Sequence, residues 1–147
     1  MSKEKNSILD YFETRFGISR NHFREFEFYL ASKGRVFLGP KKIPAIGEPV
    51  SVGILIARMD NNIKPTTNLL QLFGKYADKN IVSLTEQQTK QYAHGDDIKL
   101  SPEQTEKTER GYVILSYCNV LLGCGLLRES LIKNMLPKAK RSELKFM

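Results

Sequence analysis

Residues 111–141 read GYVILSYCNVLLGCGLLRESLIKNMLPKAKR, and they contain the clearest structural pattern in the chain. The segment YVILSY at 112–117 is rich in β-branched and aromatic residues and is bounded by turn residues, which predicts a buried strand. Asn119 tolerates a positive φ, so residues 120–127 are expected to return as the second strand of a hairpin. A Gly-Cys-Gly triplet interrupts that second strand, which indicates a bulge, a bend or a close approach by another group.

The positive charge is concentrated at the two ends of the sequence. The chain has 147 residues and a net charge of +7. Residues 1–46 hold nine Lys/Arg against five Asp/Glu, residues 128–147 hold six against two, and the residues between them hold eight against nine. If the fold brings the ends together, they form one basic face of the kind that binds polyanions. The alternative is that the surplus lysines only keep a small protein soluble.

The composition indicates one globular domain, or a small domain with an N-terminal extension. No apolar run approaches the roughly 20 residues of a membrane span, and the first residues lack a signal-peptide core, so we expect a cytoplasmic protein with no membrane partner. Cys118 and Cys124 lie in apolar sequence, far from His22 and His94. This arrangement predicts buried thiols and no metal site.

Hydrophobic spacing and capping residues predict helices and strands before the hairpin. Asn6 or Ser7 is expected to cap a first helix that ends at Gly17. Further helices are expected after Thr66 or Thr67 and after Thr85, the second of these ending at Gly95. Strands are expected at 26–32, 35–38, 50–59 and 79–84, and an exposed loop at 99–110. Residues 39–49 hold three prolines and two glycines, which predicts an internal boundary near residue 46.

Sequence patterns of catalysis are missing, whereas cationic and amide side chains are plentiful. There is no Gly-rich phosphate loop, no serine in a nucleophile elbow and no spacing that forces two carboxylates together. We therefore expect that the protein is not an enzyme and binds no cofactor. The candidate phosphate and sugar ligands are Lys64, Lys133, Asn134, Lys138, Lys140 and Arg141. Tyr92 or Tyr117 could stack a base if exposed, although a tyrosine in apolar sequence is usually part of a core.

The basic C-terminal segment has two interpretations. It is either a solvated tail or a segment that folds back on the body. The apolar residues Leu136 and Phe146 favour the second interpretation, with a final strand expected at 144–147.

From about residue 50 onward the chain resembles PUA-type RNA-binding domains, and in particular the C-terminal PUA-like domain of the Sun class of cytosine-5 RNA methyltransferases. The matching pieces, in chain order, are KPT at 64–66, IVSLTE at 81–86, YAHGDDI at 92–98, GYV at 111–113, LGCG at 122–125, Lys133-Asn134, LPK at 136–138 and Arg141. Residues 1–46 resemble the α/β extension that precedes the PUA domain in some ribosome-biogenesis proteins.

The resemblance implies an α+β (mixed α/β) fold, with a PUA-like pseudo-barrel at 47–147 preceded by a small α/β N-terminal subdomain at 1–46. It implies recognition of structured RNA through the positions around Lys133, Asn134, Lys138 and Arg141, and a structural role for Gly123 and Gly125. The chain departs from the methyltransferases because it has no S-adenosylmethionine-binding domain and no proline before either cysteine. Methyl transfer is therefore not implied.

Two functions follow as hypotheses. The first is a stand-alone RNA-binding protein for rRNA or tRNA, acting in rRNA processing, tRNA modification or ribosome biogenesis. The second is a protein-interaction adaptor that docks on an RNA methyltransferase or a ribosome-assembly factor. The adaptor hypothesis depends on the aromatic residues of the N-terminal segment, which would provide more apolar surface than one short helix needs: Tyr11, Phe12, Phe16, Phe23, Phe26 and Phe28.

Overall fold

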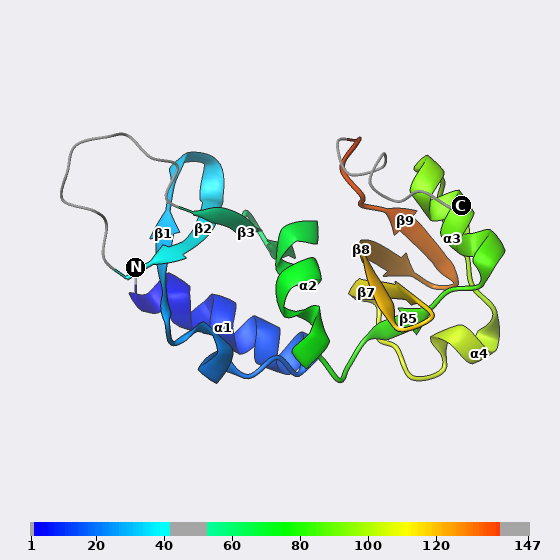
Figure 1. The fold of residues 1–147 in the computed structure, drawn as a ribbon, viewed down its shortest axis with the longest axis horizontal. Coiled ribbons are helices and arrows are strands. Elements are labelled where there is room, and N and C mark those ends of the chain that lie inside the picture. Colours follow the sequence, from blue (N-terminus) through cyan, green and yellow to red (C-terminus); the bar gives the residue numbers. More distant parts are fainter. Residues whose placement is uncertain (1, 42–52, 139–147) are drawn as a thin grey trace.

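A computed structural model describes residues 2–41 and 53–138 and shows two sheets on either side of helix α2 (Thr67–Phe73) (Figure 1). We call residues 2–65 the N-terminal lobe, of which 42–52 are outside the described residues, and residues 79–138 the C-terminal lobe. Both lobes mix helices and strands, which confirms the predicted α+β class.

The N-terminal lobe is an antiparallel four-stranded sheet with helix α1 (Ser2–Phe16) packed on it (Figure 1). The strands are in chain order in the sheet: β1 (Phe26–Leu30), β2 (Arg35–Pro40), β3 (Ile54–Met59) and β4 (Ile63–Pro65). The predicted hairpin at 26–38 is confirmed. A 3₁₀ turn at Arg20–Phe23 connects α1 to the sheet.

Helix α1 follows its apolar stripe but begins earlier than expected. It starts at Ser2, so the prediction that Asn6 or Ser7 caps it is wrong. Ile8, Phe12 and Phe16 have no exposed surface. Gly17 ends the helix with φ +74°, as its N–H donates to the Glu13 carbonyl at 3.0 Å.

The C-terminal lobe is a five-stranded sheet in the order β5-β7-β8-β9-β6. The strands are β5 (Ile81–Ser83), β6 (Ile98–Lys99), β7 (Gly111–Tyr117), β8 (Val120–Arg128) and β9 (Leu131–Asn134). β5 and β7 are parallel, and the other pairs are antiparallel. The predicted hairpin is confirmed: Cys118 and Asn119 turn with φ of 50° and 65° between β7 and β8.

Two short helices lie at the outer side of this sheet (Figure 1). α3 (Glu86–His94) begins with the expected capping box of Thr85 and Gln88 and ends at Gly95, which has φ +93°. α4 (Pro102–Thr105) lies inside the segment predicted to be a loop, so that prediction is partly wrong. Ser101 and Gln104 form a second capping box there, a signal that the sequence carried.

The two lobes share one hydrophobic core. The first cluster of buried residues includes Phe12 and Phe16 of α1 together with Ile114 of β7 and Cys124 of β8. The second cluster lies within the C-terminal lobe, around Tyr92 of α3. Sequence-distant elements therefore pack as one body.

Three further expectations from the sequence concern the two cysteines, an internal boundary and a C-terminal strand. Cys124 is buried but Cys118 is exposed, so the prediction of two buried thiols is wrong for Cys118. The predicted boundary near residue 46 and the predicted strand at 144–147 fall outside the described residues. The boundary stays a prediction, although β2 and β3, which lie on either side of it in the sequence, pair in one sheet.

Candidate functional site

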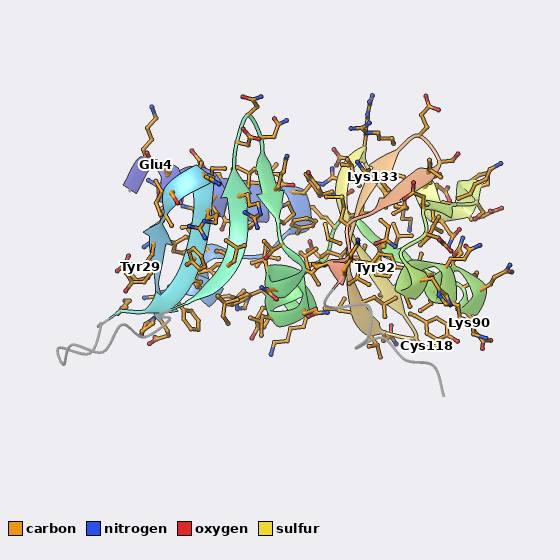
Figure 2. The ribbon with its side chains drawn as sticks, turned by 90° about the horizontal axis from the view of Figure 1, so that it is seen from above. Glu4, Tyr29, Lys90, Tyr92, Cys118 and Lys133 are labelled. Atoms are coloured by element: carbon orange, nitrogen blue, oxygen red, sulfur yellow. The ribbon has the colours of Figure 1, made fainter. Side chains whose placement is uncertain are left out.

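An open groove of about 760 Å³ lies between the two lobes. One wall comes from α1 and from residues 61–64, where β3 turns into β4, and the other comes from the β7-β8-β9 surface. Figure 2 shows Lys133 on β9 in the C-terminal lobe, across the groove from the turn between β3 and β4.

The groove is cationic. Among the described residues that line it, five are basic and none is Asp or Glu; the five are Arg15, Lys64, Arg110, Arg128 and Lys133. Its lining also includes the apolar and aromatic residues Tyr11, Ile63, Tyr112, Leu126 and Met135. Cationic side chains around aromatic and apolar groups are typical of a surface that binds nucleic acid.

Strand register aligns the C-terminal wall of the groove. Leu126 pairs with Tyr112 on one side and with Lys133 on the other, so the three side chains form one row across the sheet. Arg128 is two residues beyond Leu126 and therefore projects from the same face. The next row along this face contains Ile114 and Cys124, which are in the core shared with α1. The groove is thus the solvent-facing continuation of the contact between the lobes.

Arg15 connects the two walls of the groove by hydrogen bonds. Its guanidinium donates to three backbone carbonyls that precede or begin β7: Glu109 at 2.7 Å, Arg110 at 3.1 Å and Tyr112 at 2.7 Å. Asn80, which is 5% exposed, adds to this contact: its amide donates to the Arg15 carbonyl at 2.6 Å, and its Oδ1 accepts from the Glu109 N–H at 2.8 Å. These bonds place Arg110 at the mouth of the groove.

The structure brings two of the six candidate ligands together. Lys64 and Lys133 both line the groove, and Lys64 lies 3.9 Å from the Asp60 carboxylate. Lys138 is exposed just beyond Pro137. Lys140 and Arg141 are outside the described residues.

Asn134 is committed to contacts inside the protein. Its amide group donates to the carbonyls of Tyr92 at 2.8 Å and Asp96 at 2.9 Å, and its Oδ1 accepts from the Leu136 N–H at 2.8 Å. Both amide hydrogens are thereby used to hold the end of α3 against β9. A role for Asn134 toward RNA stays a prediction.

Sequence reasoning did not select Arg15, Arg110 or Arg128 as site residues. Arg128 could have been found from the hairpin register. It lies two residues beyond Leu126, so its side chain is on the same face of the sheet as those of Leu126 and its partner Tyr112. Arg15 and Arg110 carry no such signal, because their meeting depends on how α1 packs against β7.

The two glycines of β8 are in close contact with neighbouring side chains. A Cβ at Gly123 would lie 2.5 Å from the Tyr92 hydroxyl, and one at Gly125 would lie 2.4 Å from Ile132 Cγ2. Tyr92 has no exposed surface and donates to the Cys124 carbonyl at 2.8 Å, so it cannot stack a base. Burial raises its pKa far above the usual range of tyrosine.

Within residues 2–41 and 53–138, no three His, Cys, Asp or Glu side chains come together in a way that would hold a metal ion. No helix in this part of the chain is long and apolar enough to cross a membrane.

Comparison with known proteins identifies the C-terminal lobe. Residues 79–142 match the sequence model of the family described as the methyltransferase RsmF PUA domain. The described part of this segment, residues 79–138, forms a PUA-like domain. The PUA-like domain is related to that of the Sun-class methyltransferases, which confirms the resemblance seen in the sequence. No curated protein matches the chain.

A solved structure has a similar fold. The structure of a conserved PUA domain protein from Thermoplasma acidophilum is similar, with a TM-score of 0.63 and 15% sequence identity. The match covers 97% of this chain and 95% of that chain. It therefore includes the N-terminal lobe as well as the PUA-like domain, and it confirms the predicted PUA-like fold.

Proposed function

We propose that this protein binds structured RNA, ribosomal or transfer RNA, through the groove between its lobes. The observation that carries the proposal is the groove lining, in which the described residues include five Lys/Arg and no Asp/Glu. Phosphate oxygens are the main partners of such side chains, and their contacts fix the position of a nucleic acid on a protein. PUA domains bind RNA, which supports RNA rather than DNA as the partner.

The proposed role is that of a stand-alone binding protein without catalytic activity of its own, acting in RNA modification or ribosome biogenesis in the cytoplasm. Lys138, Lys140 and Arg141 follow the segment that leaves β9 beside the groove, and we propose that they extend the same RNA contact. A separate RNA methyltransferase or assembly factor is the proposed protein partner.

The test is binding of the purified protein to total tRNA and to rRNA fragments at two salt concentrations, with duplex DNA as competitor. We expect binding that weakens with salt and that duplex DNA fails to displace. Binding that DNA displaces equally well would show a generic polyanion surface, and absence of binding at low salt would refute the proposal.

The adaptor hypothesis depends on exposed aromatic side chains in the N-terminal segment, and most of these side chains are buried. Phe12, Phe16, Phe23 and Phe28 are buried in the shared core, and Phe26 is 37% exposed. Most of the N-terminal aromatic residues thus belong to the core and are not available to a protein partner. A pull-down from nuclease-treated lysate distinguishes the two functions, because a partner that is retained without RNA would favour the adaptor.

A further inference from the structure

A second cavity, of about 350 Å³, adjoins the groove. Lys64 and Met135 line both, so the two spaces meet at these side chains. The second cavity lies between β3, the start of α2 and Pro137, and no Asp or Glu is among its described lining residues. The inference below rests on the proposed RNA-binding function of the groove.

Thr67, the first residue of α2, lines this cavity and has a buried hydroxyl. The residue is 4% exposed, and its Oγ1 forms no hydrogen bond with any described residue. Its methyl group faces β8, where a Cβ at Gly123 would lie 3.4 Å from Thr67 Cγ2. A buried hydroxyl without a partner costs free energy that a bonded one does not, so a ligand that bonds it gains affinity.

The hydroxyl of the neighbouring Thr66, in contrast to that of Thr67, has hydrogen-bond partners. Its Oγ1 donates to the Leu55 carbonyl at 2.7 Å and accepts from the Leu69 N–H at 3.2 Å. The Thr66 hydroxyl is therefore fully bonded as the cap of α2, so an unbonded threonine hydroxyl is not a general feature of this helix end.

A row of three cations crosses the first sheet beside the cavity. Arg58 pairs in register with Arg35 of β2 and with Lys64 of β4. Like charges directly opposite one another destabilise a sheet. Asp60 lies 3.9 Å from Lys64, whereas Arg58 forms no ion pair with a described residue. Arg58 and Lys64 both line the cavity.

A bulge in β3 turns Arg58 toward the cavity. The register shift leaves Ile56 without a partner on β2, and both Ile56 and Ala57 are fully buried in the core. Because two successive residues face inward, Leu55 and Arg58 face the opposite side, where both line the cavity.

We propose that this cavity holds one nucleotide of the RNA bound in the groove. Arg58 and Lys64 contact its phosphate, and the Thr67 hydroxyl bonds either its 2′-hydroxyl or the edge of its base. The volume of about 350 Å³ is at the lower end of the range of small-ligand pockets, which suits one nucleotide rather than a duplex. The cavity then selects RNA with an unpaired nucleotide at that position.

The test is the isosteric substitution Thr67→Val, assayed with total tRNA and with single-stranded RNA and DNA dodecamers of one sequence. We expect RNA affinity to fall about three- to tenfold, the value of one hydrogen bond, and the urea midpoint to stay unchanged or rise. A loss confined to RNA assigns the bond to the 2′-hydroxyl, and an equal loss with DNA assigns it to the base edge.

The matched control is Thr89→Val. Thr89 is 1% exposed, but its Oγ1 donates to the Thr85 carbonyl at 2.8 Å on α3, away from the cavity. This substitution should lower the urea midpoint and leave affinity unchanged.

The failure of this inference is distinguishable from failure of the proposed function. If Thr67→Val binds both RNA probes within twofold of the wild type while Arg128→Ala/Lys133→Ala loses binding, the nucleotide site is refuted and the groove remains. If neither variant changes binding, both proposals are refuted.

Discussion

Replacing two groove cations should reduce the salt dependence of RNA binding by a predictable amount. Arg128 and Lys133 are exposed, on adjacent strands, and neither forms an ion pair with a described residue. The double variant Arg128→Ala/Lys133→Ala therefore removes two charges without disturbing any hydrogen bond in the described part of the chain. The groove predicts that both contact phosphates.

The magnitude follows from which cations are free to contact phosphate. The donors of Arg15 are occupied by carbonyls, and Lys64 is assigned above to the nucleotide in the adjoining cavity, which leaves three cations for the groove itself. At about 0.7 to 0.9 logarithmic units per phosphate, three contacts lower affinity about twentyfold to fortyfold for a fourfold rise in salt. One remaining contact lowers it only about threefold. The difference in slope, about 1.4 to 1.8, is independent of contacts made elsewhere on the protein.

The assay is a titration of labelled tRNA, for example by fluorescence anisotropy, between about 50 and about 200 mM salt, the range in which such slopes are commonly compared. The control is Lys90→Ala/Lys107→Ala, which changes the net charge equally. Lys90 is exposed on α3, 3.5 Å from the Glu86 carboxylate (Figure 2), and Lys107 is exposed just beyond α4. This double variant should leave the slope unchanged. Equal changes in slope for the two double variants would refute the groove as the RNA site, because they would show a dependence on total charge alone.

Three further predictions concern the scaffold. Gly123→Ala should lower the free energy of unfolding by about 1 to 3 kcal/mol in urea, because the new Cβ would displace the Tyr92 hydroxyl from its carbonyl partner; an unchanged midpoint would contradict the close contact. Arg15→Met should cost about 2 to 3 kcal/mol in the same assay, since it removes three hydrogen bonds to backbone carbonyls. In the native protein iodoacetamide should modify the exposed Cys118 but not Cys124, whose pKa burial raises to about 12, and mass spectrometry should show both modified in denaturant.

The sequence predicts local elements well where capping and turn residues act over a few positions. The β7–β8 hairpin requires only an apolar pattern and a turn residue such as Asn119 that accepts a positive φ. The capping box at Thr85 likewise involves residues three apart. α4 was missed because polar composition outweighed the equivalent box at Ser101, although the same rule applies there.

The site was harder to predict because its residues come from three separate parts of the chain. Charge counts placed the excess at both ends, and the groove does combine Arg15 from one end with Arg128 and Lys133 from the other. The contribution of Arg110 depends on the carbonyl contacts of Arg15, which no spacing in the sequence encodes. Asn134 looked like a surface ligand, but it ends β9, and its amide donates to the carbonyls of Tyr92 in α3 and Asp96 just beyond it.

The shared core gives the groove a fixed width, and this has a consequence for recognition. Ile114 and Cys124 lie on the same sheet face as Tyr112 and Lys133, and they pack against α1 at 0% and 1% exposure. Separating the lobes would expose this apolar surface, so the lobes are not expected to open and close around a ligand. A preformed groove loses little conformational entropy on binding, and it favours RNA whose shape already fits. Discrimination among RNAs should therefore reside in the geometry of the groove more than in adjustment of the protein.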